Sequence, residues 1–553
     1  MRPLQTAGAV PLMAANGAPA SWSAWRLPLA FAAATLLLGL ALATCYPLVD
    51  PDEGRNAEVA REMMARHDFV IPTLAGMPYL DKPPALFWAS AAAMAALGRH
   101  PWAARLPAVV AAALTVALVA AIGTMLSRPD LAYRASTLLL AAPLFFVLSA
   151  YVIFDMPLTL CVTVVWTTLA RELTRGASLG ARLTSFAAVG LGLLLKGPVM
   201  LAWTIGGSLG AAACLRSTAA LRWLREWRGW ALALAMAGGW FALACARHPE
   251  YPRYAFVEET FERLSSGSFH REQPLWFVPV VLVLGALPWS LTTPWLARLT
   301  PAGRIAAGFV LFAAVFFTLS RSKLVTYLLP AIPPLAWIAS EAWSEPRRAR
   351  GATWRLVALY GVLTVGIALV AARFAHGATL PRGVPPRVTS DAAVLAAGFA
   401  VAALAGVAMA RRGSPFGFVL NGAVSGLLLL LAGRSLAGYA DSQSGAPLAR
   451  ALRAQAPRGR VRYEYCYSPG TDLLLGRTSA LVSPLGLETT SNYQVRYRER
   501  LIARGMWTAL DTIPATVADV VVRPAHDARP DPAGMTCFYR DQRFAAWRAE
   551  RGD

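Results

Sequence analysis

Residues 106–127 read LPAVVAAALTVALVAAIGTMLS and contain no charged side chain. Crossing about 30 Å of hydrocarbon takes about 20 apolar residues as a helix, and a helix satisfies its own backbone hydrogen bonds, which lipid cannot do. Seven further charge-free runs have a similar length: 27–46, 135–154, 197–215, 229–246, 273–297, 392–410 and 413–433. Shorter runs can also span once their flanks are included: 156–170, 183–195, 305–320, 324–340 and 356–372. The sequence therefore predicts an all-α polytopic membrane protein with about thirteen transmembrane helices.

The overall composition agrees with a membrane protein. Of 553 residues, 56% are hydrophobic and 15% are charged, whereas soluble domains carry about a quarter charged residues. The formal net charge is +21. Much of this charge lies in loops between the apolar runs, so it needs no nucleic acid to explain it. We expect the membrane and its lipids as partners, and no nucleic acid.

Loop charge decides how the ambiguous run 83–98 is interpreted. If this run is an interfacial or re-entrant helix, the arginine-rich loops all fall on the cytoplasmic side, as the positive-inside rule requires. The loops 47–83 and 247–272 then lie outside, and both carry more acids than bases. We therefore expect a cytoplasmic tail at 1–26 and a transmembrane domain at 27–438. Its outer loops are 47–105 and 247–272, and residues 439–553 form a soluble domain on the outer side.

That C-terminal domain alternates short apolar runs with Pro, Gly and Asp breaks, which predicts a small α/β or β-rich domain. No catalytic motif stands out in it, and we interpret its arginines as solvated surface. Cys466 and Cys537 are its only cysteines. In an oxidising compartment they are candidates for a disulfide.

Lysine is scarce, which makes its positions informative. Of 52 basic residues only Lys82, Lys196 and Lys323 are lysine, and the predicted topology places all three at the outer membrane boundary. Lysine is a compact point charge suited to phosphate, whereas arginine is a planar fork. The alternative is that these lysines are anchors whose stems lie along the membrane, and Lys196 is followed by a Gly-Pro pair that also suits a helix break.

Carboxylates occupy the same predicted face. Asp52 and Glu53 follow Pro51 in the first outer loop, where a proline and two acids are typical of a helix start. An N-terminal capping role for Asp52, worth about 1 kcal/mol, is the structural alternative. Asp155 separates two apolar runs, and a carboxylate at membrane depth is costly and often functional. Its alternative is again a cap or turn.

The second outer loop has the spacing of an amphipathic helix lying on the membrane. His270 and Arg271 come shortly before Trp276, where they face headgroups or a phosphate. A divalent metal bound by His270 with a carboxylate such as Asp81 is a weak candidate, and a surface histidine is the commoner case. Together these residues suit an anionic lipid headgroup, with cations on a leaving phosphate and a carboxylate near the reacting carbon.

Several motifs in order resemble a known family. They are Pro51-Asp52-Glu53-Gly54-Arg55, Tyr79-Leu80-Asp81-Lys82-Pro83-Pro84, Leu195-Lys196-Gly197-Pro198, His248-Pro249, His270-Arg271, Leu287-Pro288-Trp289, and Ser320-Arg321-Ser322-Lys323 with Tyr327. They are similar to polyprenyl-phosphate-dependent glycosyltransferases of the GT-C type, and most similar to the lipid A 4-amino-4-deoxy-L-arabinose transferases, relatives of the protein O-mannosyltransferases. The likeness covers most of residues 45–340 and fades beyond them.

The resemblance implies which residues do what. Asp52 matches the family's catalytic carboxylate, and Asp155 matches a second acidic position near the site. Lys82 matches the cation expected to hold the donor phosphate, with Arg55 and Arg271 as weaker candidates. The further site candidates are Asp81, Glu53, Lys196, His270, Lys323 and Tyr327. Two departures stand out, because Asp81 replaces the usual Glu and Asn56 replaces a common aromatic residue.

The resemblance further implies transfer of a sugar, 4-amino-4-deoxy-L-arabinose, from undecaprenyl phosphate to a lipid A phosphate at the periplasmic face of the bacterial inner membrane. The resemblance implies an undecaprenyl-phosphate sugar as the lipid donor, and it implies no certain cofactor. Two alternatives stay open. One is a related transferase that acts on a protein or another glycolipid. The other is a transporter or lipid flippase, against which stand the lack of an inverted repeat and the gathering of charges at one face rather than the midplane.

Overall fold

A computed structural model describes residues 22–262, 272–293, 298–375, 388–412, 415–435, 437–456, 459–507 and 519–549. Each of the thirteen predicted apolar runs lies on helix. Ten of them form one continuous helix each: α1 (Trp22–Cys45), α4 (Pro101–Met125), α7 (Asp155–Arg175), α8 (Leu179–Lys196), α9 (Val199–Leu215), α10 (Trp227–Arg247), α14 (Pro301–Leu319), α16 (Pro346–Ala375), α17 (Val388–Arg412) and α18 (Pro415–Ser435).

The other three runs are each broken into two short helices. They form α5 (Pro129–Leu140) with α6 (Pro143–Leu148), α12 (Phe277–Gly285) with α13 (Trp289–Thr292), and the 3-10 helix η3 (Val325–Ala331) with α15 (Ile332–Trp343). The breaks fall beside Pro143, Pro288 and Pro330. Proline lacks the N–H that a helix interior needs, and its ring clashes with the preceding turn. The continuous apolar pattern therefore hides three interruptions.

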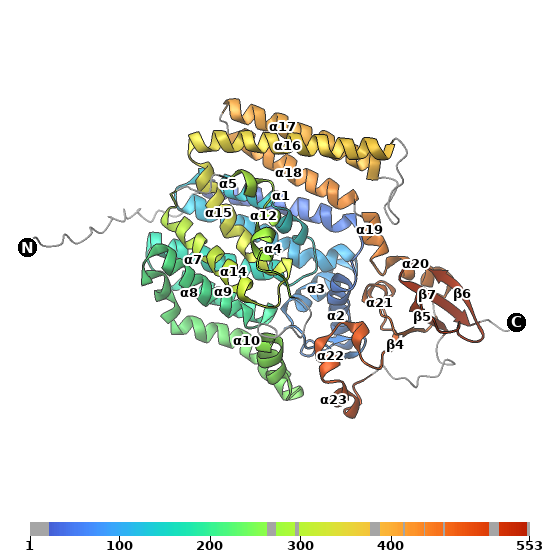
Figure 1. Cartoon of the computed structure of the whole chain (residues 1–553). Helices are drawn as coiled ribbons and strands as arrows, with labels where there is room; N and C mark the ends of the chain where they lie inside the picture. The colour runs from blue at the N-terminus through green and yellow to red at the C-terminus, as the bar shows by residue number, and fades with distance from the viewer. Residues whose placement is uncertain are drawn as a thin grey trace, which may run out of the picture.

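Within the described residues, eight helices are long and apolar enough to cross a membrane: α1, α4, α8, α10, α14, α16, α17 and α18. The predicted fold class, a helical multi-pass membrane protein, is confirmed. The number of thirteen crossings stays a prediction. In Figure 1, α16, α17 and α18 form a layer along one side of the bundle, opposite α8, α9 and α10.

Small residues allow helices in the bundle to approach closely. Gly210 on α9 and Gly308 on α14 face each other, and a methyl group added at Gly210 would lie 2.2 Å from the carbonyl oxygen of Gly308. Helices in lipid associate through such packing of small residues, because lipid supplies no hydrophobic force between them. These two glycines therefore fix the contact between α9 and α14.

The first outer loop is folded. It contains α2 (Asp52–Arg66), a hairpin of β1 (Thr73–Leu74) and β2 (Met77–Pro78), and α3 (Ala85–Leu97). At 1.5 Å per residue, the 13 residues of α3 extend only about 20 Å, less than the hydrocarbon thickness. This length supports the interpretation of run 83–98 as a helix that does not cross. The second outer loop begins after α10 and contains the π-helix η2 (Arg253–Glu262).

The C-terminal part forms a small α/β domain, as predicted. Its five-stranded sheet has the order β4-β3-β5-β7-β6, in which β3 pairs in parallel with β4 and β5 while β7 pairs antiparallel with β5 and β6. The strands are β3 (Val461–Glu464), β4 (Ala480–Val482), β5 (Val520–Pro524), β6 (Met535–Arg540) and β7 (Phe544–Ala549). The helices of this domain are α19 (Ala437–Ser442), α20 (Ala446–Gln455), α21 (Pro469–Leu475), η4 (Leu487–Thr489), α22 (Asn492–Arg496) and α23 (Arg498–Ala503). In the bundle, the 3-10 helix η1 (Thr218–Arg225) joins α9 to α10.

The candidate disulfide between Cys466 and Cys537 is not formed. Both thiols are free, with Cys466 buried and Cys537 exposed. Cys466 follows β3 and Cys537 lies in β6, three strand spacings away in the sheet. At about 4.8 Å per spacing the two chains are about 14 Å apart, twice the reach of a disulfide.

The C-terminal domain lies at the end of the helix bundle where α2 and α3 also lie (Figure 1). Helix α21 packs on α2. Asp50 accepts hydrogen bonds from the Ser468 hydroxyl at 2.7 Å and from the Gly470 backbone N–H at 3.1 Å. The first outer loop is therefore held between the membrane helices and the soluble domain, and this arrangement positions the site described next.

Candidate functional site

A cavity of about 260 Å³ opens between the outer loops and the ends of the bundle helices. Seven of the predicted site residues line it: Asp52, Arg55, Asp81, Lys82, Asp155, Lys196 and Tyr327. Aromatic and aliphatic side chains form the rest of its wall, including Phe154, Leu158, Trp203, Phe316 and Phe317. The cavity thus joins a charged region to an apolar one, which suits a ligand with a charged head and a hydrocarbon chain.

Asp52 reaches the cavity because it begins α2. Asp52 and Glu53 occupy the first turn of that helix, where carboxylates are stabilised by the helix dipole. The N-cap position of α2 is Pro51 and not Asp52, so Asp52 is not the capping residue that the structural alternative required. It is 53% exposed and pairs with Arg55 at 2.7 Å.

Lys82 lies in the cavity beside a carboxylate from the second outer loop. Its Nζ donates to Glu259 Oε1 and to the Asp81 carbonyl oxygen, both at 2.7 Å. Glu259 belongs to η2, so the ion pair joins the two outer loops.

Asp155 and Lys196 form a second ion pair in the cavity. Lys196 Nζ donates to Asp155 Oδ1 at 2.6 Å and lies 4.6 Å from the centre of the Tyr327 ring. Asp155 begins α7 and Lys196 ends α8. The pair places a cation and an anion where two helix ends meet, with an aromatic face beside them.

Asp81 has a structural task in addition to lining the cavity. Its carboxylate accepts hydrogen bonds from Tyr254 Oη at 2.5 Å, from the Tyr493 backbone N–H at 3.1 Å and from the Ser491 hydroxyl. These donors come from η2 and from the soluble domain. Asp81 therefore ties the first outer loop to both neighbours.

Two other predicted candidates do not line the cavity. Glu53 is fully buried and pairs with Arg105 at 2.6 Å, and it also accepts from the backbone N–H groups of Val49 and Val152. Lys323 is buried, and its Nζ donates to the Gln273 carbonyl oxygen at 3.0 Å. Both side chains hold the structure around the site rather than facing the cavity.

His270 and Arg271 lie outside the described residues. Glu272 directly follows them, and its backbone forms an isolated antiparallel β-bridge with Ser322, which lines the cavity. Among the described residues, no three His, Cys, Asp or Glu side chains gather into a group that could hold a metal ion.

The soluble domain contributes two cavity residues that the sequence analysis missed. Thr490 and Asn492 line the cavity, and Arg55 Nη1 donates to Thr490 Oγ1 at 2.5 Å although the two residues are 435 positions apart. No motif spacing links residues so distant in the chain. A single sequence offers no signal that could have found them.

A buried cluster beside the cavity binds the second outer loop to the same domain. Tyr493 Oη donates to Glu250 Oε1 at 2.6 Å, and Arg504 donates to both Glu250 oxygens at 3.2 Å. Burial opposes charge on Glu250, but its hydrogen bonds with Tyr493 and His248 outweigh that effect, so the pKa of Glu250 is lowered. The carboxylate stays ionised and fastens the second outer loop, just before η2, to the C-terminal domain.

Known proteins are similar to this chain both in sequence and in fold. Residues 81–237 match the family of dolichyl-phosphate-mannose-protein mannosyltransferases. An undecaprenyl phosphate-alpha-4-amino-4-deoxy-L-arabinose arabinosyl transferase from Pseudomonas paraeruginosa is 31% identical over 360 residues, which are 61% of this chain and 63% of the relative. The protein of the same name from Pectobacterium atrosepticum is 27% identical over 72% of this chain and 74% of its own. The chain thus matches less than two thirds of the length of the first of these relatives.

Two crystal structures have the same fold. ArnT from Cupriavidus metallidurans bound to undecaprenyl phosphate has a TM-score of 0.79 and 24% identity, over 94% of this chain and 97% of that one. The apo form of the same protein has a TM-score of 0.78 and 23% identity. The predicted resemblance to GT-C glycosyltransferases is confirmed, and it extends through the soluble domain.

Proposed function

We propose that this chain, a multi-pass membrane protein with the fold of ArnT, transfers 4-amino-4-deoxy-L-arabinose from undecaprenyl phosphate to a phosphate of lipid A. The observation that carries the proposal is the cavity. It joins Asp52, Lys82 and Lys196 to an apolar wall at the ends of the membrane helices, as a polyprenyl-phosphate sugar requires. The names of the relatives from Pseudomonas and Pectobacterium supply the sugar and the donor lipid.

The proposed reaction exchanges one phosphate oxygen for another at the anomeric carbon. The bond from that carbon to the donor phosphate breaks, and its electron pair leaves with undecaprenyl phosphate. An oxygen of the lipid A phosphate forms the new bond. A phosphate monoester is largely ionised near pH 7 because its second pKa is about 6, so the acceptor needs no strong base.

Each charged residue then has a task. Lys82 is the cation for the leaving phosphate, which takes over the position of Glu259 on its ammonium group. Preorganised charges of this kind stabilise the charge that develops as a bond breaks. Asp52 orients the acceptor or stabilises positive charge at the anomeric carbon. With a protein hydroxyl as the acceptor, Asp52 would have to act as a general base.

The orientation follows from charge. The arginine-rich loops face the cytoplasm under the positive-inside rule, which puts the cavity and residues 439–553 on the periplasmic side of the inner membrane. Both substrates of the proposed reaction are lipids, and the cavity opens at the ends of helices that cross the membrane. A divalent metal held by His270 and Asp81 is part of the proposal only as a site to test.

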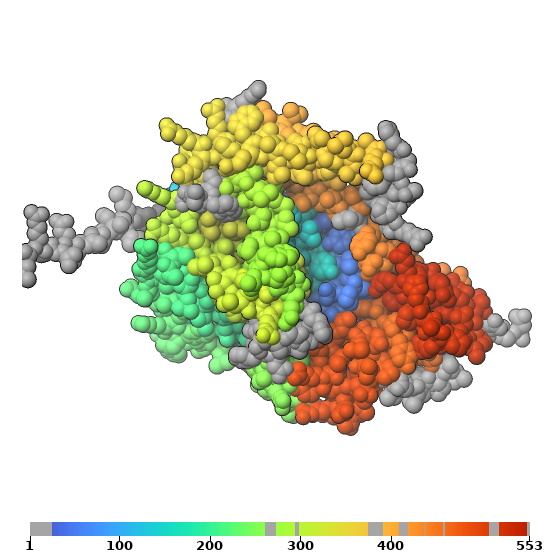
Figure 2. Space-filling model, in the orientation of Figure 1, coloured from blue at the N-terminus to red at the C-terminus, as the bar shows by residue number. Residues whose placement is uncertain are grey.

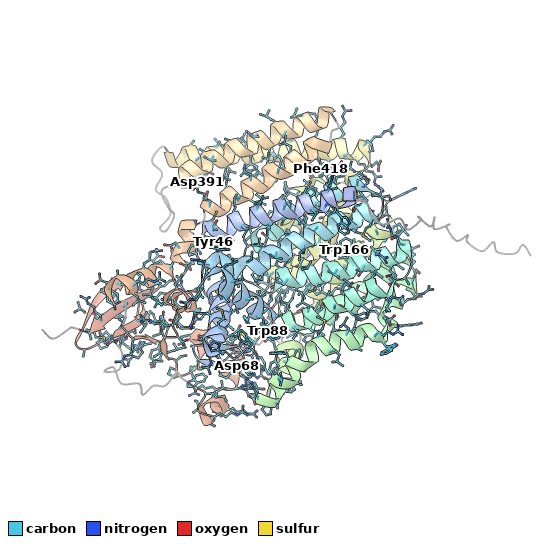
Figure 3. All side chains as sticks on the ribbon, turned by 180° about the vertical axis from the view of Figure 1, so that it is seen from behind. Tyr46, Asp68, Trp88, Trp166, Asp391 and Phe418 are labelled. Carbon is cyan, nitrogen blue, oxygen red and sulfur yellow. The ribbon has the colours of Figure 1, made fainter. Side chains whose placement is uncertain are left out.

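The test is mass spectrometry of lipid A from cells that lack their own aminoarabinose transferase and express this chain. We expect the aminoarabinose mass increment with the parent chain and its loss with Asp52→Asn. Asp68→Asn is the matched control, because Asp68 is an aspartate of the same outer loop that pairs with Arg247 outside the cavity. In Figure 3, Asp68 and Trp88 are labelled close to each other, away from Trp166 among the helices of the bundle.

Other results have distinct meanings. No increment from an inserted parent chain, with donor present, contradicts the sugar or the acceptor and favours a related transferase for a protein or another glycolipid. If cells that express Asp52→Asn still show the aminoarabinose mass increment at near-normal yield, Asp52 is not a catalytic residue. Movement of lipid across vesicles without covalent transfer favours the transporter alternative.

A further inference from the structure

Two polar side chains of the soluble domain reach the cavity from a segment that is fastened to its rim. They are Thr490 and Asn492, on either side of Ser491 at the start of α22. In Figure 2 the orange residues of this domain lie directly against the blue residues of the N-terminal part. The segment therefore forms one wall of a cavity whose other walls come from the outer loops and membrane helices.

Hydrogen bonds on the far side of the segment hold it in place. Gln494 is fully buried, and its amide nitrogen donates to the carbonyl oxygens of Leu74, Met77 and Pro78 at 3.2–3.3 Å. These carbonyls belong to strands β1 and β2 of the hairpin in the first outer loop. The buried amide thus fixes α22 against this loop.

Asp81 fixes the same segment from the cavity side. It accepts from the Ser491 hydroxyl and from the Tyr493 N–H, while the Ser491 hydroxyl in turn accepts from the Gln494 N–H at 3.2 Å. Every residue from 491 to 494 except Asn492 is thereby used to dock the domain. The side chain of Asn492 has no hydrogen-bond partner in the described part of the chain.

Thr490 is held in a conformation that threonine rarely adopts. Its φ is 56°, in the left-handed region, where a β-branched residue is an outlier. Strained residues of this kind persist only where the surroundings over-determine them, and they gather at functional sites. In this conformation Thr490 Oγ1 accepts a hydrogen bond at 2.5 Å from Arg55, the partner of Asp52.

The carboxamide of Asn492, which has no partner among the described residues, is suited to one class of ligand group. Asn offers two donors and an acceptor and carries no charge, so it complements the hydroxyl groups of a sugar rather than a phosphate. The cavity already supplies Lys82 and Lys196 for phosphate. The neutral wall at Asn492 and Thr490 is therefore suited to the sugar that the phosphate carries.

We propose that Asn492, with Thr490, binds hydroxyl groups of the transferred sugar and makes the soluble domain a part of the sugar-binding site. The inference rests on the proposed function and names the residues that recognise the sugar. Asn492 is then a specificity-determining residue, and the soluble domain takes part in binding the donor.

The test compares two ligands that differ only in the sugar. Affinities for undecaprenyl phosphate and for undecaprenyl phosphate carrying aminoarabinose are measured with purified full-length parent, Asn492→Ala and Gln443→Ala. Gln443 is the control, an amide side chain of the same domain outside the cavity. A neutral hydrogen bond is worth about 1 kcal/mol, so we expect Asn492→Ala to weaken the sugar-bearing ligand about five- to tenfold and leave the sugar-free ligand unchanged.

The outcomes separate this inference from the proposed function. Equal weakening of both ligands indicates a structural role for Asn492 and overturns the inference. So does an unchanged affinity of Asn492→Ala for the sugar-bearing ligand, or a parent protein that does not distinguish the two ligands. A parent that prefers the sugar-bearing ligand through Asn492, yet transfers nothing to lipid A, leaves the inference standing and contradicts the proposed acceptor.

Discussion

Six of the seven charged side chains that line the cavity are paired with one another. Asp52 pairs with Arg55, Lys82 with Glu259, and Asp155 with Lys196. Such pairing satisfies charges that would otherwise be costly to bury. A phosphate that enters must therefore compete with these carboxylates for the cations of the cavity.

Removing the charge of Lys82 should weaken binding of the donor phosphate. Hydrogen bonds to charged groups contribute about 1.5–3 kcal/mol, so we expect Lys82→Ala to bind undecaprenyl phosphate about 10- to 100-fold less tightly, and Lys82→Arg to recover part of the loss. Lys323→Met is the control, because Lys323 does not line the cavity. Equal loss in both variants, measured by titration of the purified protein, would contradict the role of Lys82.

Glu53 should matter for stability more than for chemistry. It is fully buried against Arg105, and breaking a buried ion pair by removing one partner costs about 3–5 kcal/mol. We expect Glu53→Gln to lower the thermal midpoint clearly, whereas Asp68→Asn, in an exposed pair, changes it little. Loss of transfer by Glu53→Gln at an unchanged midpoint would return Glu53 to the catalytic candidates.

The predicted residues that line the cavity come from local motifs, and the cavity residues that the sequence analysis missed come from a distant segment. Asp52, Lys82 and Lys196 each lie in a short motif, and the structure brings them to one cavity. Glu53 sits one residue from Asp52, so the same motif could not show that its side chain points into the protein. Thr490 and Asn492 lie in a segment without a motif, since their task depends on tertiary docking.

Helices were predicted well because apolar runs reflect the surrounding lipid. All thirteen runs are helical, but the breaks at Pro143, Pro288 and Pro330 follow from local backbone chemistry that hydropathy averages away. Cysteine pairing could not be judged from such a local pattern. It depends on strand order, and β5 and β7 lie between the strands near Cys466 and Cys537.

The contact between α2 and α21 should depend on pH. Burial raises the pKa of Asp472 to about 7, against lowering by its Ser479 hydrogen bonds, and burial raises the pKa of Asp50 to about 6. Both exceed the value of about 4 in an unfolded chain. A raised carboxyl pKa means that the folded state holds the proton more tightly. This stabilisation is therefore complete below about pH 4 and is lost as pH rises through about 7.

We expect Asp472→Asn, which imitates the protonated carboxyl, to flatten that dependence. The thermal midpoints of the parent and of the variant, measured between pH 4.5 and 8, test this. The midpoint of the variant should rise relative to that of the parent as pH rises. Arg61, which pairs with Glu58 next to this contact, keeps its charge throughout. Parallel curves for the two proteins would show that Asp472 does not titrate in this range.

The whole molecule is organised around docking of its last domain on both outer loops. Asp50, Asp81 and Glu250 each accept hydrogen bonds from that domain. A chain that ends at residue 438 should therefore insert in the membrane and yet transfer no sugar, because its cavity lacks a wall. Lipid A mass spectrometry with a membrane-insertion control measures this, and transfer at the parental level would separate the domain from the activity.

The position of Thr490 and Asn492 also sets an order of events in biosynthesis. Arg55 leaves the ribosome 435 residues before the threonine that it meets, so every membrane helix is made before the cavity can close. A nascent or prematurely terminated chain carries the lysines and carboxylates of the site but no finished pocket. The cavity is therefore complete only once the segment that carries Thr490 and Asn492 has been made and has docked on the outer loops.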